Sequence, residues 1–273
     1  MSQNILEINN LSKYFGGLAA VSNCSLKVKK GTITGIIGPN GSGKTTLFNL
    51  IAGNLKSSTG NVLFNNENIT NMESYELFSK GLLRTFQIAH EFTNLSVLEN
   101  LMMVPGNQSG EKLMNTFLKP SLVAREEEKI KKKAKEVVEF LNLGHLSNEL
   151  AGNLSGGQKK LLELGRTMMV DAKLVLLDEV GAGVNRTLLK ELGTAIVKLN
   201  KEKGYTFCMI EHDMDFIGRL CDPVIVMAEG SVLFEGSVLF EGSVLFEGSV
   251  ENAKKDEKVI ESYLGRGSRL KDN

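Results

Sequence analysis

The feature that most constrains this chain is the stretch from Ile33 to Gly53, which reads TGIIGPNGSGKTTLFNLIAG from Thr34 on. β-Branched residues before a Pro/Asn/Gly cluster predict a short buried strand that ends in a turn. Apolar residues then recur at i, i+3 and i+4 before a glycine, which predicts a helix: Leu47, Leu50 and Ile51, then Gly53. The loop between them fits G-x-x-x-x-G-K-[ST], a phosphate-binding loop, so a chance glycine-rich turn is a poor explanation.

The residue types in this loop follow from phosphate chemistry. A polyphosphate needs many backbone N–H donors, and only a loop without Cβ atoms lets the main chain come that close. The positive end of the following helix also favours an anion. We expect the Lys44 ammonium at the β/γ-phosphates and the Thr45 hydroxyl on magnesium. The residues expected to bind the nucleotide phosphates are Gly38, Asn40, Gly41, Ser42, Gly43, Lys44, Thr45 and Thr46.

Length and composition set broad limits on this chain. Its 273 residues allow one large or two small domains, and 42% hydrophobic residues suit a globular core. The formal net charge is zero, which offers no electrostatic reason to expect nucleic acid or an anionic membrane as a partner. The three cysteines have no metal-type spacing, so we expect reduced, buried thiols in a cytosolic protein. Without a signal peptide or an apolar run of about 20 residues, work at a membrane requires docking on an embedded partner.

The first third of the chain reads as an antiparallel β portion around the phosphate loop. Residues 5–31 alternate short apolar runs with turns. Within them, Phe15 is the expected stacking surface for adenine, with Tyr14 as the alternative and plain packing as the simpler interpretation. Residues 55–70 predict two short strands around a turn at Ser57–Gly60, and a short helix follows at about Tyr75 to Lys80.

The middle of the chain predicts an inserted helical subdomain, residues 88–152. It follows Leu82–Gln87, an apolar strand that ends in an amide. Residues 105–120 hold two of the four prolines and read as a loop. Residues 126–141 carry an apolar stripe at helical spacing, so they predict an amphipathic helix, and the Lys131–Lys133 run reads as its solvated face.

The second half returns to a doubly wound α/β pattern. Leu154–Gln158 reads as a loop that opens a helix, with Ser155 as N-cap. The run 174–177 is apolar on both faces, as in a central parallel strand. A helix at about 188–201 and a strand at 206–210 follow. In such folds ligands bind at the carboxyl ends of the strands.

Four side chains after these strands are the catalytic and metal candidates. Asp178 ends a buried strand and is expected to hold magnesium, directly or through water. Glu179 suits a general base that polarises the attacking water. His212 is placed to touch the γ-phosphate and orient that water, and the Gln87 amide can reach magnesium or the water. His90 and His145 lack such support and read as surface or packing residues.

A tandem hexapeptide, Ser-Val-Leu-Phe-Glu-Gly, occurs three times over residues 231–248. Each copy reads as a strand with a turn, and a slip of six residues returns every side chain to its original face. Two interpretations stay open. Either one copy joins the sheet and the others form a protruding loop or ribbon, or all form a β-meander that binds a partner by its edge.

Taken together, these residues resemble the ATP-binding subunits of ABC transporters. Leu154-Ser155-Gly156-Gly157-Gln158 looks like the signature of that family, and the order of loop, glutamine, signature, acidic strand and histidine matches it. The resemblance implies a P-loop NTPase (RecA-like) α/β core, with an N-terminal antiparallel β portion and an inserted helical subdomain. It also implies ATP and Mg²⁺ as cofactors and a head-to-tail dimer. There, Ser155, Gly156, Gly157 and Gln158 of one subunit contact the γ-phosphate held by Lys44 of the other.

Finer detail resembles one branch of the family. Gly81–Gln87 and Leu98–Asn100 look like the ATPase subunits of branched-chain amino acid importers, with lipopolysaccharide-export and urea-import ATPases as similar alternatives. This implies permease subunits and a second ATPase subunit, identical or not, as partners, a peripheral place at the cytoplasmic face of the membrane, and no nucleic acid. Two rivals are a soluble ABC protein of repair or translation, and a non-hydrolysing module suggested by Val180 and Asn185, where the family has proline and aspartate.

The expected domain organisation follows from this resemblance. Residues 1–87 and 153–229 form the ATP-binding α/β core, and residues 88–152 form the helical subdomain. The repeat occupies 230–250, and a C-terminal helix or tail occupies 251–273.

Overall fold

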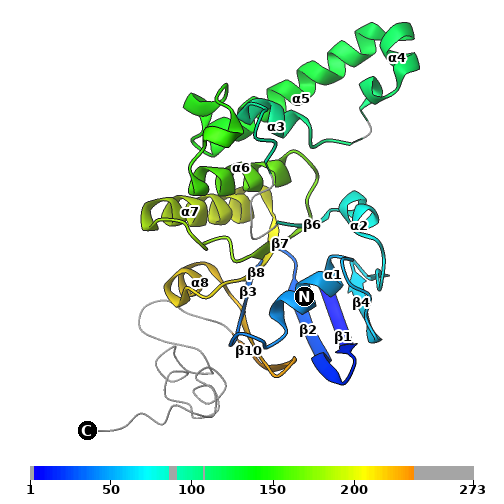
Figure 1. The fold of residues 1–273 in the computed structure, drawn as a ribbon, viewed down its shortest axis with the longest axis vertical. Helices are drawn as coiled ribbons and strands as arrows, with labels where there is room; N and C mark the ends of the chain where they lie inside the picture. The colour runs from blue at the N-terminus through cyan, green and yellow to red at the C-terminus, as the bar shows by residue number, and fades with distance from the viewer. Residues whose placement is uncertain (1–2, 86–90, 107, 237–273) are drawn as a thin grey trace. The chain divides into compact units, whose positions relative to one another are not determined.

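The computed structural model describes residues 3–85, 91–106 and 108–236. The chain divides into two compact units (Figure 1). Unit 1 comprises Met1–Arg84, Lys173–Gly181 and Val197–Asn273, and unit 2 comprises Thr85–Ala172 and Ala182–Ile196. Unit 2 therefore extends past the expected helical subdomain, 88–152, into the helix that follows Ser155 and the start of the next one.

A six-stranded sheet forms the centre of unit 1. Its spatial order is β10 (Ser231–Gly236), β9 (Val224–Ala228), β3 (Ile33–Ile37), β8 (Thr206–Ile210), β7 (Leu174–Asp178) and β6 (Leu82–Arg84). All neighbours pair in parallel except β10, which is antiparallel to β9 at one edge. The carboxyl ends of β3, β7 and β8 therefore meet at one edge, which confirms the predicted α/β core.

A second, antiparallel sheet confirms the predicted N-terminal β portion. Its order is β2 (Leu18–Lys29), β1 (Asn4–Phe15), β4 (Thr59–Phe64) and β5 (Glu67–Asn68). Helix α1 (Lys44–Ile51) shares one apolar core with strands of both sheets, and its Leu47 and Phe48 are fully buried. The phosphate-binding loop is thus held between two sheets at the start of a well-packed helix.

The predicted turn at Ser57–Gly60 is wrong, because β4 already begins at Thr59. Gly60 has a φ of 84°, and a Cβ there would lie 2.4 Å from the carbonyl oxygen of Asn10 on β1. The glycine therefore marks a close approach of two strands. The reversal lies at Asn65 and Asn66, both with positive φ, as in the tight turns that twisted hairpins favour.

The remaining helices of unit 1 lie outside the two sheets. They are α2 (Ser74–Lys80), α8 (Met214–Leu220) and the last part of α7 (Arg186–Lys203). The predicted helix at Tyr75–Lys80 is confirmed, and a capping box between Glu73 and Glu76 sets its start at Ser74. The first copy of the hexapeptide forms β10, while residues 237–273 lie outside the described residues.

Unit 2 is helical, as the sequence predicts. Its elements are α3 (Val97–Met102), η1 (Ser109–Glu111), α4 (Leu113–Leu118), α5 (Pro120–Phe140), η2 (Gly144–Leu146), η3 (Ala151–Asn153), α6 (Gly156–Met168) and the first part of α7. The amphipathic helix is confirmed, with Ala134, Val137 and Val138 buried, but it begins at Pro120, the favoured first position of a helix. The predicted loop at 105–120 is wrong in part, since it contains η1 and α4.

Candidate nucleotide site

The loop between β3 and α1 has glycines where no other residue fits. A Cβ on Gly38 would lie 2.1 Å from the carbonyl oxygen of Met227, and one on Gly43 would lie 2.4 Å from that of Ala20. Gly43, with a φ of 92°, is the N-cap of α1, and no side chain caps this helix end. The first N–H groups of α1 thus lack intrahelical partners and can bind an anion.

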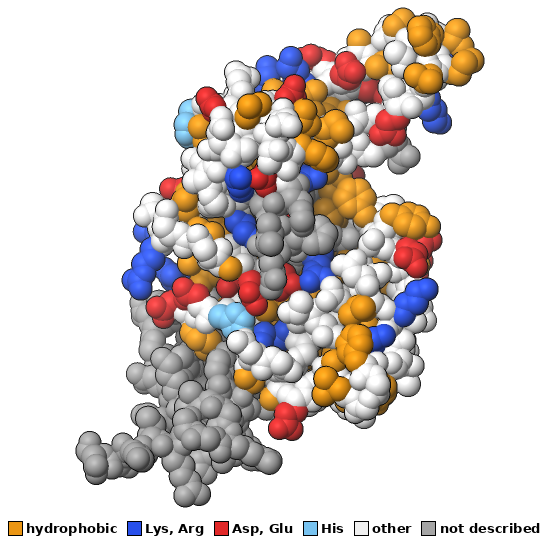
Figure 2. All heavy atoms as spheres, in the orientation of Figure 1, with side chains coloured by type: hydrophobic (Ala, Val, Ile, Leu, Met, Phe, Trp, Pro, Cys, Tyr) orange, Lys and Arg blue, Asp and Glu red, His pale blue; other side chains and the backbone are white. Residues whose placement is uncertain are grey.

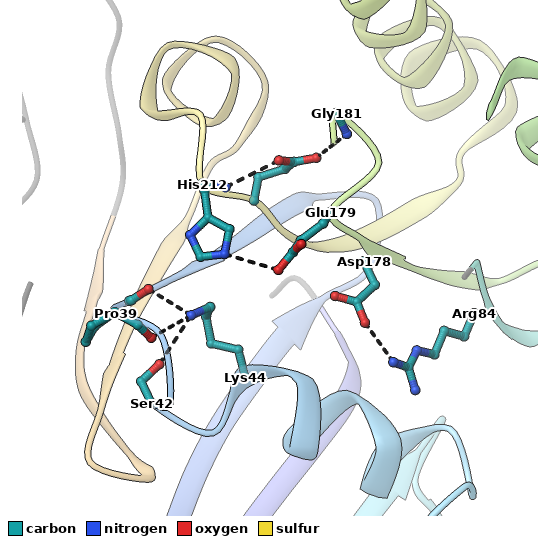
Figure 3. Close-up of polar contacts among 10 residues, drawn as sticks. Pro39, Ser42, Lys44, Arg84, Asp178, Glu179, Gly181 and His212 are labelled. Atoms are coloured by element: carbon teal, nitrogen blue, oxygen red, sulfur yellow. Dashed lines mark hydrogen bonds and ion pairs between the residues drawn. The ribbon is translucent and has the colours of Figure 1, made fainter. Parts of the chain in front are cut away.

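Lys44 is the first residue of α1 and is buried. Its Nζ donates to the carbonyl oxygens of Gly38, at 2.8 Å, and Pro39, at 2.9 Å, and lies 3.4 Å from the Ser42 hydroxyl (Figure 3). Burial lowers the pKa of Lys44, and the nearby Glu179 and Asp178 carboxylates oppose this shift. The same loop thus brings together an ammonium group and the N-terminus of a helix.

Asp178 ends β7 and forms a buried ion pair. Arg84 Nη2, at the end of β6, donates to Asp178 Oδ2 at 2.7 Å, and the two side chains are 10% and 1% exposed. Nη1 of the same arginine donates to Asn49 on α1. Asp178 Oδ1 is buried and has no hydrogen-bond partner among the described residues. An orphaned carboxylate oxygen beside the loop is a suitable ligand for a cation or its water.

Sequence reasoning assigned no role to Arg84. The available signal was the single charge of Arg84 at the end of an apolar run. A buried charge requires a partner of opposite charge. Its partner could not be named, because Arg84 and Asp178 are 94 positions apart.

Glu179 and His212 point toward each other at the carboxyl edge of the sheet. His212 Nε2 lies 3.1 Å from Glu179 Oε1 (Figure 3). Glu179 has a φ of 48°, in the left-handed region that costs a non-glycine residue energy. The backbone there turns away from β7, so successive carboxylates take different places: Asp178 pairs with Arg84, and Glu179 lies by His212.

Glu211 is a second carboxylate that sequence reasoning left without a role. It is buried, and its Oε1 accepts a hydrogen bond from Gly181 N at 2.6 Å while Oε2 accepts one from His212 N at 3.3 Å. Burial raises the pKa of Glu211, and these two hydrogen bonds oppose the shift. The side chain links the segments that follow β7 and β8, so it is a positioning group for Glu179 and His212. Its place directly before His212 was the only sequence signal.

The two aromatic candidates lie at the end of β1. Phe15 is 48% exposed and Tyr14 is 46% exposed, so each can offer a ring face to a ligand. Lys13 Nζ lies 5.2 Å from the centre of the Phe15 ring and donates to the carbonyl oxygen of Lys56. Because both rings are exposed, Phe15 and Tyr14 stay alternative stacking surfaces for adenine.

The predicted signature segment opens α6 in unit 2. Ser155 is the N-cap, as predicted, and it forms a capping box with Gln158: its hydroxyl accepts from Gln158 N, and Gln158 Oε1 accepts from Ser155 N at 2.9 Å. A Cβ on Gly157 would meet the Leu188 side chain of α7 at 2.4 Å, whereas Gly156 has open space around it. The departure at Asn185 is mild in structure, since its Oδ1 accepts a hydrogen bond from Leu188 N, as an aspartate would.

Other predicted residues are placed as follows. Asn40, Gly41 and Thr45 are exposed, and Thr46 is partly buried, all within the loop and the first turn of α1. His145 is exposed, as expected, whereas Gln87 and His90 lie outside the described residues.

The three cysteines are free and buried, and burial raises the pKa of Cys24 and Cys208 to about 12, which keeps these thiols protonated. No group of three metal-ligating residues occurs in the described part of the chain.

Comparison with known proteins decides the family. A family profile described as "ABC transporter" matches residues 21–182, which is more than half of the chain. The chain belongs to the ABC transporter family. The residues of this ATP-binding cassette that first indicated the family, the phosphate loop and the segment at Ser155, both lie within the match.

Named relatives cover almost the full length of the cassette. The chain is 41% identical to the "Probable branched-chain amino acid transport ATP-binding protein LivG" of Methanocaldococcus jannaschii, over 97% of this chain and 98% of that protein. It is similar to a crystal structure of the ADP conformation of an ABC transporter cassette, at 40% identity and a TM-score of 0.80, with 97% of this chain and 100% of that one covered. A dimeric bacterial cassette matches at 25% identity and a TM-score of 0.69, over 85% and 98%. The cassette is therefore a nucleotide-binding protein of a family that hydrolyses ATP in transport.

Proposed function

We propose that this cassette is the ATP-hydrolysing subunit of an importer of branched-chain amino acids. The observation that carries the proposal is its similarity, across nearly its whole length, to a relative named as the ATP-binding protein of branched-chain amino acid transport. The transported molecule never contacts an ATPase subunit in this architecture, so the site itself supports only the ATP chemistry. The branch resemblance supports the cargo.

The nucleotide is bound by the loop residues and by α1. The N–H groups at the helix start and the Lys44 ammonium attract the phosphates. Lys44 Nζ has three N–H donors, and they contact the carbonyls of Gly38 and Pro39 and, at 3.4 Å, the Ser42 hydroxyl. The ammonium group therefore exchanges at least one of these three contacts to reach the β/γ-phosphates. Phe15 stacks on adenine, with Tyr14 as the alternative surface.

Magnesium fits the residues at this edge of the sheet. Thr45 offers an exposed hydroxyl, and Asp178 offers the carboxylate oxygen that has no partner among the described residues. Gln87 would complete the set, although it lies outside the described residues. When bound, Mg²⁺ neutralises charge on the phosphate oxygens.

Glu179 and His212 act on the attacking water. The Glu179 carboxylate accepts a proton from the water as the water oxygen attacks the γ-phosphorus. The bond between the γ-phosphorus and the oxygen that bridges it to the β-phosphate breaks, so ADP leaves and inorganic phosphate forms. His212 is held by its contact with Glu179 at 3.1 Å, and it orients the water and the γ-phosphate. Glu211 fixes the backbone on both sides through Gly181 and His212, so the two groups keep their relative positions.

The working state is a head-to-tail dimer with two ATP molecules. Ser155, Gly156, Gly157 and Gln158 form a second anion site at the start of α6, and this site takes the γ-phosphate bound to Lys44 of the partner. The dimeric structure of a related cassette supports this assembly. The partner subunit is a second copy or a homologous ATPase.

The membrane partners are permease subunits docked on unit 2. None of the described helices combines the length and the apolar character needed to cross a bilayer. We infer a peripheral location at the cytoplasmic face, where the permeases hold the cassette.

The test is phosphate release by the purified protein with Mg-ATP. Glu179→Gln removes the base while keeping the shape of the side chain, so it should abolish most turnover and trap an ATP-bound dimer. The matched control is Glu202→Gln, because Glu202 is an exposed carboxylate near the end of α7. This variant should leave turnover unchanged. Undiminished phosphate release by the Glu179→Gln protein would refute the assignment. Leucine uptake by vesicles that contain the complete transporter tests the cargo separately.

A further inference from the structure

Arg84 connects three elements at the edge of the sheet where the nucleotide loop lies. It is the last residue of β6, and its side chain is 10% exposed. Nη2 of its guanidinium group donates to Asp178 Oδ2 on β7 at 2.7 Å (Figure 3). Nη1 donates to Asn49 Oδ1 on α1. All three residues belong to unit 1, so a single side chain links β7 to α1 within that unit.

This link joins the two described groups that are proposed to hold magnesium. Asn49 lies four residues after Thr45, and residues at this spacing share one face of a helix. Asp178 ends β7, whereas Thr45 lies in the first turn of α1, so the two groups come from distant parts of the sequence. Because Arg84 bonds both to Asp178 and to the face of α1 that carries Thr45, it restrains their spacing in the absence of a metal ion.

The charge of Arg84 matches that of Asp178. A guanidinium group keeps its proton in proteins, so this positive charge is permanent. It lies against a carboxylate that is 1% exposed, and it weakens the attraction of that carboxylate for any other cation. Figure 2 shows a similar mixture of signs at the surface, where acidic and basic side chains lie together beside a histidine on the face in view.

The pair nevertheless leaves one oxygen of Asp178 available. Arg84 contacts Oδ2, whereas Oδ1 is buried and has no hydrogen-bond partner among the described residues. A cation can therefore reach Asp178 through Oδ1 while the ion pair through Oδ2 persists.

We propose that Arg84 is a positioning residue that takes the place of the metal ion at Asp178 until nucleotide binds. Without nucleotide, the charge-matched carboxylate attracts a divalent cation too weakly to retain it. Cation binding then depends on the negative charge that the ATP phosphates add at the loop. Magnesium therefore enters the site together with ATP. The inference rests on the proposed function for the role of Asp178 as a magnesium group.

A purely structural ion pair is the alternative interpretation. Both interpretations predict that Arg84→Met destabilises the nucleotide-free protein, since the substitution leaves Asp178 uncompensated. Only the proposed role predicts that the stranded carboxylate then binds a divalent cation in the absence of nucleotide. Cation binding, rather than stability or turnover, therefore separates the two.

The experiment measures Mn²⁺ binding by the nucleotide-free full chain, with free Mn²⁺ quantified by electron paramagnetic resonance. We expect Arg84→Met to bind one Mn²⁺ per chain at least about 10-fold more tightly than the unaltered protein. Removing a unit charge several ångströms from a divalent cation changes its affinity by about that much even at the dielectric constant of water. Arg84→Lys keeps the positive charge, so it should bind Mn²⁺ as weakly as the unaltered protein. Excess Mg²⁺ should displace the Mn²⁺ bound to Arg84→Met.

Two control variants show where the cation binds. Arg84→Met combined with Asp178→Asn lacks the stranded carboxylate, so it should lose the added Mn²⁺ site. Lys80→Met breaks an ion pair of nearly the same length, 2.8 Å to Glu67, but those side chains are 30% and 55% exposed. Water already solvates that carboxylate, so this variant should gain no Mn²⁺ site.

Asn49→Ala tests the positioning role without stranding a charge. It removes the contact of Arg84 on α1 and keeps the ion pair with Asp178. The nucleotide-free variant should gain no Mn²⁺ site. Its complex with a nonhydrolysable ATP analogue should bind Mn²⁺ about 10-fold more weakly than the same complex of the unaltered protein, as expected when a group that orients a metal ligand is lost.

Three outcomes would overturn the proposal, and they identify the part that fails. If Arg84→Met gains no Mn²⁺ binding, while Asp178→Asn weakens Mn²⁺ binding in the complex with the ATP analogue, only the role of Arg84 is wrong. If Asp178→Asn has no effect in that complex, the proposed magnesium role of Asp178 is wrong as well. If Asn49→Ala leaves the Mn²⁺ affinity of the complex unchanged, Arg84 does not position Asp178 against α1.

Discussion

The ion pair between Arg84 and Asp178 allows a quantitative test of the site. Arg84 Nη2 and Asp178 Oδ2 are 2.7 Å apart, and the side chains are 10% and 1% exposed. The perturbation is Arg84→Met, which keeps an unbranched apolar stem at this position and removes the charged guanidinium group. Asp178 Oδ1 has no partner among the described residues, so the variant leaves a buried carboxylate without its ion pair.

The expected loss of stability is large for one substitution. Breaking a buried pair by removing one partner costs about 3–5 kcal/mol, because the other charge stays buried and uncompensated. For a domain of this size, 1 kcal/mol lowers Tm by about 2–4 °C. We therefore expect Arg84→Met to lower the nucleotide-free Tm by roughly 6–20 °C.

The assay is thermal unfolding by circular dichroism, with a matched control in the same unit. Lys80 Nζ lies 2.8 Å from Glu67 Oε1, nearly the same separation, but these side chains are 30% and 55% exposed. An exposed pair contributes about 0–1 kcal/mol, so Lys80→Met should lower Tm by no more than about 4 °C. The double variant Arg84→Met with Asp178→Asn should recover much of the loss, because it also removes the stranded charge.

Two results would contradict this reasoning. If Arg84→Met unfolds at the same temperature as Lys80→Met, burial does not set the strength of the pair. If the double variant is no more stable than Arg84→Met, the loss does not come from an uncompensated charge on Asp178.

Three further predictions concern the loop, Glu211 and the repeat. Gly38→Ala should weaken binding of a fluorescent ATP analogue by more than about 10-fold, because its Cβ would lie 2.1 Å from the Met227 carbonyl oxygen; unchanged affinity would contradict this. Burial raises the pKa of Glu211 above 4.5, so the stability that this group contributes is greatest below that pH and is lost as pH rises through the raised value. Glu211→Gln should therefore flatten the fall in urea-unfolding free energy above pH 4.5, and an unaltered pH profile would refute this. Deleting 237–248 leaves one hexapeptide copy to form β10 and should change Tm by less than about 2 °C, whereas a large loss would assign the extra copies to the sheet.

The sequence alone determined the features that depend on neighbouring residues. The strand before the phosphate loop, α1, the Ser155 N-cap, β7 and β8 were all predictable, because each follows from apolar periodicity and capping chemistry over a few positions. The same reasoning misplaced the turn after Leu55, since a glycine that permits close strand contact looks like a glycine in a turn. It also read residues 105–120 as a loop, because α4 has only six residues and its apolar side does not enter a core.

Tertiary structure decided which distant residues meet. Arg84 and Asp178 are 94 positions apart and become partners because β6 and β7 lie side by side in the sheet. Glu211 and Gly181 meet because β8 is the other neighbour of β7. Local patterns indicate that a charge must be buried, but strand order determines what compensates it. For the same reason, only the folded chain reveals that the apolar side of α4 remains uncovered.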